Sequence, residues 1–304
     1  MLKYFNTNWF KNKQVIITGV SSGIGRELAR QLVSDFNCNI LGIARNVTKL
    51  ETLKEELGDH FVYHSMDVGS KEAWQEFAES DLVSFFSPDI LINNAGIIHP
   101  FIRFLDLDEK EMERVINTNY LSLIYACRAM LPILEQSAHP ALINVSSASA
   151  LLPVAGASIY SSTKSAAYSL TDVLREELMG SGYYVACVLP GPVKTDLYSP
   201  HSGDGQSSKV ADKDLFANAG ISSSRAAKII LRKMSHRKNV ITVGGIAKGM
   251  GWFKNYLPDS SIDITGAMLR ALPIKTFQGL FINENVIRKE RRRKHKQAKK
   301  NRNY

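Results

Sequence analysis

The sequence predicts an α/β fold built on a doubly wound parallel sheet. Short apolar runs typical of buried strands alternate with amphipathic stretches typical of helices through most of the chain. The first run leads directly into a glycine-rich turn and a helical pattern, which is the order of a strand–turn–helix unit. With 304 residues, of which 44% are hydrophobic, the chain can bury the core that such a sheet requires.

The positive charge is confined to the end of the chain. Residues 288–304 contain ten Lys or Arg and one Glu, which leaves 28 basic and 28 acidic residues in positions 1–287. A neutral globule with a basic tail indicates an appended anchor or a solvated, disordered arm. The basic run has no interleaved aromatic residue before Tyr304, which argues against nucleic acid as the partner.

The cysteines predict a cytoplasmic protein. Cys38, Cys127 and Cys187 are odd in number and lie in apolar runs, which indicates buried thiols in a reducing compartment. Residues 1–10 lack the apolar core of a secretory signal, and no stretch of about 18 apolar residues is present. The histidines are scattered, so no metal site is predicted.

The strand predicted at 14–18 leads into a turn suited to a phosphate. Gly19, Gly23 and Gly25 allow the backbone to turn sharply and approach a ligand, whose charge would meet free N–H groups where the next helix begins. The alternative is a tight turn without a ligand. The next strand, 39–44, ends at Arg45, and an arginine there favours a 2′-phosphate over a free 2′-hydroxyl. We therefore expect NADP(H) to be preferred, with NAD(H) not excluded; the alternative is an arginine that points to solvent.

The alternation continues with a helix at 47–57 and strands at 61–66 and 89–92. The last of these strands is followed by Asn93-Asn94-Ala95-Gly96, whose small residues permit the close approach of a flat ring. A long helical pattern from 108 to 134 is broken by Asn117 and Asn119. These amides either face solvent or mark a helix distortion whose freed carbonyl holds a water.

Tyr160 and Lys164 lie four residues apart in a segment that follows a strand predicted at 141–145. In a helix the two side chains share a face, and the ammonium would lower the pKa of the phenol. Ser147, at the strand end, could converge on this pair. Taken alone, the pair could also be ordinary helix-surface residues.

Beyond this helix, a strand at 184–189 ends in a rigid proline turn at 190–195, where open α/β sheets bind ligands. Residues 199–220, rich in Ser, Gly, Asp and Lys, are expected to form a mobile lid. A helix at 222–234 and a strand at 239–243 complete the alternation.

Four motifs in this order resemble those of the short-chain dehydrogenase/reductase family. They are Thr-Gly-x-x-x-Gly-x-Gly at 18–25, Asn-Asn-Ala-Gly at 93–96, Tyr-x-x-x-Lys at 160–164 and Pro-Gly-x-Val-x-Thr at 190–195. The resemblance covers roughly 12–245 and implies a seven-stranded Rossmann-like sheet and hydride transfer between a nicotinamide and a carbonyl or alcohol. It also implies pairing into a homodimer through the helices at 108–134 and 158–180, unless the C-terminal extension blocks it.

The resemblance further implies the roles of individual residues. Tyr160 would be the acid or base, Ser147 would bind the substrate oxygen, and Lys164 would lower the tyrosine pKa and hold the nicotinamide ribose. Asn119 is the better match to the family's helix asparagine, although Ser122 departs from the glycine expected three residues later. Ser146 and Asn117 are the neighbouring alternatives. The implied cofactor residues are Gly19, Ser21, Ser22, Gly23, Ile24, Gly25, Arg45, Asp67, Val68, Asn94, Ala95, Gly96, Tyr160, Lys164, Pro190, Gly191, Val193 and Thr195.

Apolar residues near these motifs favour a hydrophobic ketone or secondary alcohol as substrate, and a lipid-like one fits this pattern. They are Ile97, Ile98, Pro100, Phe101, Leu151, Leu152, Val154 and Leu197. We expect a catalytic domain at 1–245, an apolar and aromatic extension at 246–287 and the basic tail at 288–304. The extension and tail predict peripheral contact with an anionic membrane; alternatively, the extension covers the substrate pocket. A different function, a dinucleotide sensor or an RNA-associated protein with an idle site, is disfavoured by the intact Ser-Tyr-Lys set.

Overall fold

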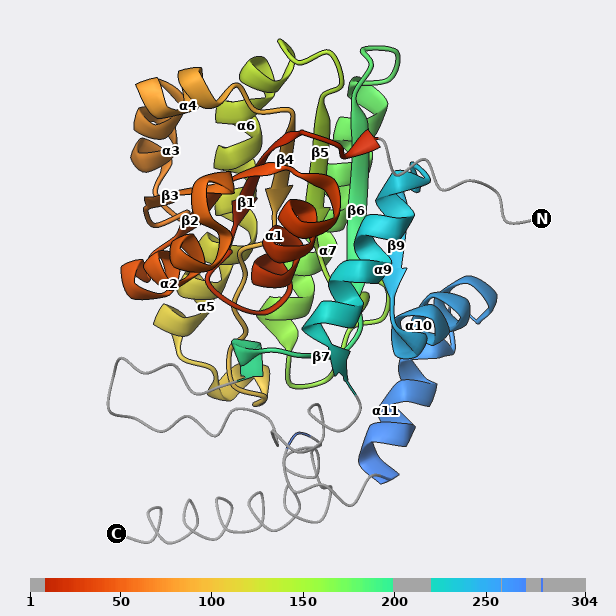
Figure 1. Ribbon diagram of the computed structural model, residues 1–304. Helices are drawn as coiled ribbons and strands as arrows, with labels where there is room; N and C mark the ends of the chain where they lie inside the picture. Colours follow the sequence, from red (N-terminus) through yellow and green to blue (C-terminus); the bar gives the residue numbers. More distant parts are fainter. Residues whose placement is uncertain (1–8, 199–219, 258, 272–279, 281–304) are drawn as a thin grey trace, which may run out of the picture.

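The computed structural model describes residues 9–198, 220–257, 259–271 and 280, and its centre is a seven-stranded sheet (Figure 1). The strands are arranged in the order β3-β2-β1-β4-β5-β6-β9, and every neighbouring pair is parallel. The predicted doubly wound sheet is therefore confirmed. The strand bounds are β1 Gln14–Thr18, β2 Asn39–Ala44, β3 Phe61–Ser65, β4 Ile90–Asn93, β5 Ala141–Val145, β6 Tyr184–Pro190 and β9 Val240–Val243.

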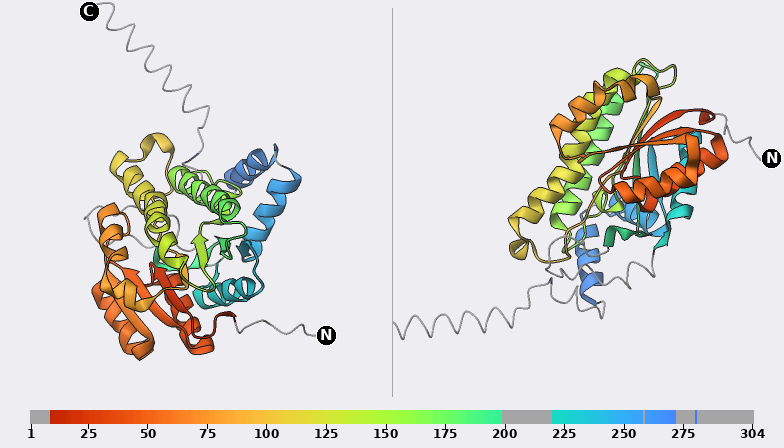
Figure 2. Two further views of the ribbon diagram at one scale, coloured as in Figure 1. Left: turned by 90° about the horizontal axis from the view of Figure 1, so that it is seen from above. Right: turned by 60° about the vertical axis from the view of Figure 1, so that its left-hand side comes forward.

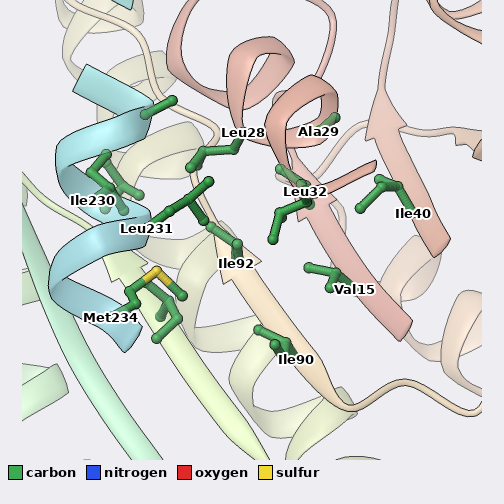
Figure 3. Close-up of a cluster of buried hydrophobic side chains, with 14 of the residues drawn as sticks. Val15, Leu28, Ala29, Leu32, Ile40, Ile90, Ile92, Ile230, Leu231 and Met234 are labelled. Atoms are coloured by element: carbon green, nitrogen blue, oxygen red, sulfur yellow. The ribbon is translucent and has the colours of Figure 1, made fainter. Parts of the chain in front are cut away.

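Helices cover both faces of the sheet (Figure 2) because each central strand is buried on both sides. On one face, α1 (Gly23–Phe36), α2 (Val47–Leu57) and α9 (Ser223–Ser235) pack on alternate strand residues. Figure 3 shows this core, in which side chains of α1 such as Leu28 and of α9 such as Leu231 meet above Ile92 of the sheet.

The opposite face holds the residues between those alternate positions, such as Ile16 and Leu91. They pack with helices that include α3 (Lys71–Ala78), α6 (Ser122–Leu134) and α7 (Ser158–Glu177). The short α4 (Asp81–Phe86) also lies on this side. Trp74 and Phe77, buried on α3, complete this second core.

The predicted long helix at 108–134 consists of three parts. An α-helix, α5 (Glu109–Ile116), is followed by a π-helical turn at Asn117–Leu121 and then by α6. The predicted distortion is therefore present, and it coincides with both asparagines.

Two helices follow the last strand of the sheet. They are α10 (Gly245–Tyr256) and α11 (Ser261–Ala271), shown in blue in Figure 1. A short pair of parallel strands, β7 (Val193–Lys194) and β8 (Ile221–Ser222), lies before α9. Among the described residues, no helix is both long and apolar enough to cross a membrane. The predicted lid at 199–220, apart from residue 220, and the basic tail at 288–304 lie outside the described residues.

Candidate active site

A cavity of about 780 Å³ lies at the carboxyl ends of the strands. The strand order reverses between β1 and β4, which is the point where ligands bind in sheets of this kind. The structure places most of the predicted site residues on its wall; Gly25 and Asn119 are not among them. The predicted residues on the wall are Gly19, Ser21, Ser22, Gly23, Ile24, Arg45, Asp67, Val68, Asn94, Ala95, Gly96, Ser147, Tyr160, Lys164, Pro190, Gly191, Val193 and Thr195.

Hydrogen bonds and close packing join the glycine turn to the Asn-Asn-Ala-Gly turn. Thr18 Oγ1 accepts hydrogen bonds from the backbone N–H of Asn94 (2.9 Å) and of Ala95 (3.0 Å), and the Asn94 amide donates to the Thr18 carbonyl (2.9 Å). Gly19 has φ +68°, and a Cβ on it would lie 2.8 Å from the Ala95 Cα. A Cβ on Gly25 would lie 2.5 Å from the Asn94 amide nitrogen. Gly25 therefore supports the turn from behind, which explains its absence from the cavity wall.

Helix α1 begins at this turn without a side-chain cap. Ser22 is in the N-cap position, but its hydroxyl accepts no hydrogen bond from the helix, and the first turn has no acidic residue. The helices α2, α3 and α9 are capped by Asn46, Ser70 and Ser222. The first N–H groups of α1, which face the cavity beside Ser22 and Gly23, are therefore suited to an anion.

Arg45 lies at the far end of the cavity, next to two residues that the sequence did not single out. Asn46 and Lys49, at the start of α2, also line the cavity. Lys49 Nζ lies 3.3 Å from Asp196 Oδ2, on the opposite rim. Since Lys49 follows Arg45 by four residues at the start of a predicted helix, a search for a second cation near Arg45 could have found it.

Asn119 holds the loop after β4 in place. Its side-chain oxygen accepts from the Ile97 N–H (2.8 Å), and its amide donates to the Ile97 carbonyl (2.9 Å) and to Thr163 Oγ1 (3.3 Å). The side chain is 2% exposed, so it does not face solvent. Asn119 thus links the π-helical turn to α7 and to the segment after Gly96.

The departure at Ser122 is accommodated by the π-helical turn. The Ser122 N–H donates to the Asn117 carbonyl, five residues back, so the Thr118 carbonyl loses the amide partner of an ordinary α-helix. The Ser122 hydroxyl donates to that Thr118 carbonyl at 2.6 Å. The serine therefore satisfies the backbone group that the distortion leaves over.

Ser147, Tyr160 and Lys164 converge where β5 ends and α7 begins. Tyr160 and Lys164 lie one turn apart on α7, with the Lys164 Nζ 5.9 Å from the centre of the Tyr160 ring. The Ser147 Oγ accepts from the Ser149 N–H (3.1 Å), which leaves the hydroxyl proton free to donate. Ser146 Oγ instead donates to the Lys164 carbonyl (2.6 Å), so Ser146 fixes the helix.

The lowering of the Tyr160 pKa by Lys164 stays a prediction, because burial is the largest influence on both groups in this structure. Burial raises the pKa of Tyr160, and the interaction with the Ser147 hydroxyl lowers it in part. Burial also lowers the pKa of Lys164 to about 8. The Lys164 Nζ donates to the Val145 carbonyl at 3.0 Å. Desolvation therefore disfavours the charged form of both groups.

A chain of buried amides behind the site was not anticipated as functional. Asn93 donates to Asn144 Oδ1 (2.9 Å), Asn144 donates to Thr171 Oγ1 (3.0 Å), and Thr171 donates to the Ala167 carbonyl (2.6 Å). These bonds connect β4 and β5 to the helix that carries Tyr160. An asparagine inside the apolar run 141–145 was the available signal.

The reacting end of the cavity is apolar. Among the residues predicted to flank the substrate, Ile97, Ile98, Phe101, Val154 and Leu197 line the cavity. Pro100, Leu151 and Leu152 do not line it. The C-terminal helices add Ile246, Met250 and Leu269, so part of the extension borders the cavity.

The described residues hold no group of three or more His, Cys, Asp or Glu side chains that could bind a metal ion. The three cysteines are free and buried, as predicted. Burial raises the pKa of Cys127 and Cys187 to about 12. These thiols therefore act as apolar core residues rather than nucleophiles.

Comparisons with known proteins agree with the site. Residues 13–204 match the short chain dehydrogenase family. The chain is 30% identical over 233 residues to the NADP-dependent 3-hydroxy acid dehydrogenase of Schizosaccharomyces pombe, covering 75% of this chain and 89% of that protein. It is 30% identical over 179 residues to the NADP-dependent 3-hydroxy acid dehydrogenase YdfG of Escherichia coli, covering 59% of this chain and 72% of the relative.

Among solved structures, an alcohol dehydrogenase from Thermococcus sibiricus, complexed with 5-hydroxy-NADP, superimposes with a TM-score of 0.63 at 26% identity. The match covers 75% of this chain and 94% of that one. The seven-stranded sheet, the site and these matches together establish that the chain belongs to the short-chain dehydrogenase family.

Proposed function

We propose that this protein is an NADPH-dependent carbonyl reductase that interconverts a hydrophobic ketone and its secondary alcohol. One observation carries the proposal: a single cavity joins the Ser147 and Tyr160 hydroxyls to a helix N-terminus and two basic side chains. Such a cavity can hold a dinucleotide and an uncharged carbonyl at once. The Asn-Asn-Ala-Gly turn connects its two ends.

The residues fit a phosphorylated dinucleotide. The uncapped N-terminus of α1 would hold the pyrophosphate, and Arg45 with Lys49 would hold the 2′-phosphate. A Cβ on Gly96 would lie 3.1 Å from Lys164 Nζ, so glycine leaves more room beside the lysine for a nicotinamide ribose than a larger residue would. When bound, the nicotinamide supplies the hydride. The relatives named as NADP-dependent support the same preference, and NAD(H) remains the alternative cofactor.

The side chains of this chain handle the oxygen and its proton. We assign to the Ser147 hydroxyl a hydrogen bond to the substrate oxygen, which strengthens as that oxygen gains negative charge. Tyr160 then donates its phenolic proton to the oxygen, and its raised pKa keeps that proton in place until the charge develops. Lys164 stabilises the resulting phenolate, and Asn119 positions the π-helical turn whose backbone faces the proton route.

The substrate class follows from the wall of the reacting end. Among the described residues there, Lys164 is the one basic side chain, and its ammonium is bonded to Val145. A carboxylate on the substrate would lack a dedicated counter-charge. The apolar wall therefore favours an uncharged ketone or alcohol, and a lipid-like chain would fill it best.

The test of the reaction is Tyr160→Phe. We expect NADPH oxidation with a hydrophobic ketone to fall by about a thousandfold, because the proton donor is lost. Cofactor affinity, measured by the NADPH fluorescence change, should stay within about twofold of the parent protein, since the ring remains. Turnover at the parent rate would exclude Tyr160 as the acid.

The test of the cofactor is Arg45→Ala combined with Lys49→Ala. Loss of both cations should raise the KM for NADPH by about a hundredfold and leave the KM for NADH nearly unchanged, because NADH lacks the 2′-phosphate. Steady-state kinetics with both cofactors measure the ratio. An equal effect on NADPH and NADH would contradict the assignment of these residues to the 2′-phosphate.

We further propose that the protein acts in the cytoplasm as a homodimer, peripherally bound to anionic membranes through residues 246–304. The excess of Lys and Arg in that segment supports the membrane contact. Ile116 of α5 and Val173 of α7, exposed on neighbouring helices, support the pairing. Light scattering at several protein concentrations measures the assembly.

A further inference from the structure

The C-terminal helices contribute an apolar wall to the reacting end of the cavity. Ile246 and Met250 of α10 and Leu269 of α11 line it. Leu269 also packs in the hydrophobic cluster that contains Tyr160 and Phe101. These helices lie beyond residue 204, where the match to the family ends, so this wall is a feature of the extension.

The same two helices expose large apolar and aromatic side chains on their outside. Trp252 is 53% exposed and Tyr256 is 68% exposed, and their ring centres lie 5.2 Å apart. On α11, Ile262 and Met268 are 49% and 59% exposed. We call these four side chains the outer patch. Adjacent exposed aromatic rings on a helix are the kind of surface that partitions into a lipid interface.

One residue connects the inner wall to the outside. Ile246 lines the cavity and is also 45% exposed, so the apolar end of the cavity reaches the molecular surface beside α10. Figure 1 shows α10 and α11 together at the carboxyl end of the sheet, where the cavity lies. An apolar substrate could therefore enter the cavity beside Ile246, at the start of the helix that carries Trp252 and Tyr256.

The positive charge of residues 246–304 favours an anionic lipid surface as the partner. Residues 246–304 contain 14 Lys or Arg and 4 Asp or Glu, whereas residues 1–245 contain 24 and 25. Within α10 itself, Lys248 and Lys254 are exposed beside the aromatic rings. Basic residues with Trp and Tyr complement the headgroups and the upper acyl region of an anionic bilayer. A second copy of this chain would bring like charges together.

We propose that α10 and α11 form a two-sided port, whose outer patch rests on an anionic lipid surface and whose inner wall conducts a membrane-dissolved ketone with an aliphatic chain to Tyr160. The reduction of that ketone rests on the function proposed above. The docking rests on the described side chains of the two helices together with the basic composition of residues 246–304, and the route rests on the described side chains alone.

The docking is tested with the full chain carrying Trp252→Ser and Tyr256→Ser, neither of which lines the cavity. Phe85→Ser is the matched control, because Phe85 is 88% exposed but lies on α4, away from the patch. In flotation on phosphatidylcholine vesicles with phosphatidylserine, we expect the double variant to bind about tenfold more weakly than the parent and the control, as the loss of two interfacial aromatic rings predicts. Equal binding by all three proteins would overturn the proposal. A changed oligomeric state in light scattering, with unchanged vesicle binding, would assign the patch to a second copy.

The route is tested by presenting ketones in two ways. With a short water-soluble ketone, the double variant should oxidise NADPH at the parent rate. With a long-chain ketone dissolved in the same vesicles, its rate should fall about tenfold, in line with its weaker binding. Leu269→Trp should narrow the cavity at its inner wall. This variant should bind the vesicles as the parent does, but it should reduce the long-chain ketone more slowly both in vesicles and in detergent micelles.

The outcomes separate the two proposals. If the parent protein reduces neither ketone, the proposed function fails, and flotation still decides the docking. If the double variant reduces the vesicle-bound ketone at the parent rate, the port fails while the proposed function stands. If the double variant no longer reduces the short ketone, the substitutions have damaged the site. That result would also overturn the assignment of Trp252 and Tyr256 to the outside.

Discussion

Lys164 is a buried ammonium, with 4% of its surface exposed and the Val145 carbonyl as its hydrogen-bond partner. Burial lowers its pKa to about 8, which means that the folded state disfavours the charged form. A methionine of similar volume would avoid this desolvation cost. The lysine therefore opposes stability at neutral pH, as residues kept for function commonly do.

This relation predicts a pH-dependent gain in stability for Lys164→Met. Because the folded-state pKa of about 8 lies below the ordinary lysine pKa of 10.5, the unfolded parent holds more protons between these values. The parent therefore loses stability as the pH falls from 10.5 through 8, whereas the variant does not. At pH 7 the variant should be more stable by on the order of 2 kcal/mol, with little difference near pH 10.5. Urea unfolding at both pH values measures this, and an advantage independent of pH would contradict it.

The sequence predicts which residues meet at the site but not their protonation. A spacing of four places Tyr160 and Lys164 on one helix face, whatever surrounds them. Their pKa values depend on how thoroughly they are buried, and the cluster that contains Tyr160 is packed by Leu269, more than a hundred residues away. Such a contact has no local signature in the sequence.

At the scale of elements, the start of α1 differs from the helices around it. Its first N–H groups lack the side-chain cap present in α2, α3 and α9. This leaves backbone donors unsatisfied by protein on the cavity side. Helices α7 and α10 also begin without a side-chain cap, so it is the position of the α1 start on the cavity wall that makes its free donors suited to an anion.

The Ser22→Asp variant should be more stable than the parent protein but should bind NADPH more weakly. A carboxylate at the N-cap should stabilise α1 by about 1 kcal/mol. It should also raise the KM for NADPH by about tenfold or more, because it repels phosphate from the same N–H groups. Thermal unfolding and steady-state kinetics measure the two effects. Ser22→Asn, which caps without charge, is the control, and a lower KM in the aspartate variant would refute the anion site.

Helices and strands whose apolar residues recur at a clear helical or strand spacing were predictable, and other elements were not. The strands and the helices at 47–57 and 222–234 were predicted close to their observed ends. The break at Asn117 and Asn119 was also predicted, but its π-helical form depends on the bond from Ser122 to Asn117. Helices α3 and α4 were missed because they are short. In about two turns, apolar residues recur too few times for a helical pattern to be recognised.

At the scale of the molecule, stability and chemistry are located at opposite ends of the sheet. Strand β6 begins at Tyr184 and ends at Pro190, which lines the cavity. At the Tyr184 end, the Arg237 guanidinium lies over the rings of both Trp9 (4.3 Å) and Tyr184 (5.0 Å), whose centres are 5.4 Å apart. These contacts fasten the N-terminal segment to the sheet, far from the reacting groups.

Arg237→Ala should therefore lower stability without lowering activity. The loss of two cation–π contacts should cost about 1 to 2 kcal/mol in the free energy of unfolding. The kcat/KM for NADPH should remain at the parent value. Chemical denaturation and kinetics test both statements, with the exposed Arg225→Ala on α9 as the control. A comparable loss of stability in the control would assign the effect to general surface charge.

The whole-molecule arrangement was predictable as far as the family resemblance extends. The sheet and the switch point follow from the alternation of strands and helices and from the four motifs. The position of α10 and α11 does not follow from the sequence. Amphipathic segments broken by Gly and Pro show the same apolar period whether they lie on a membrane or on the protein core. The structure adds that these two helices have both an inner and an outer apolar side.

The uncapped start of α1 also couples the lifetime of the chain to its supply of cofactor. A ligand that binds only the folded state adds about 2.7 kcal/mol of stability when its free concentration is a hundred times its dissociation constant. An anion that satisfies the α1 donors would act in this way, so the chain without it would open more often and be degraded sooner. The abundance of the protein in a cell would then follow the concentration of its dinucleotide, without any dedicated regulatory site.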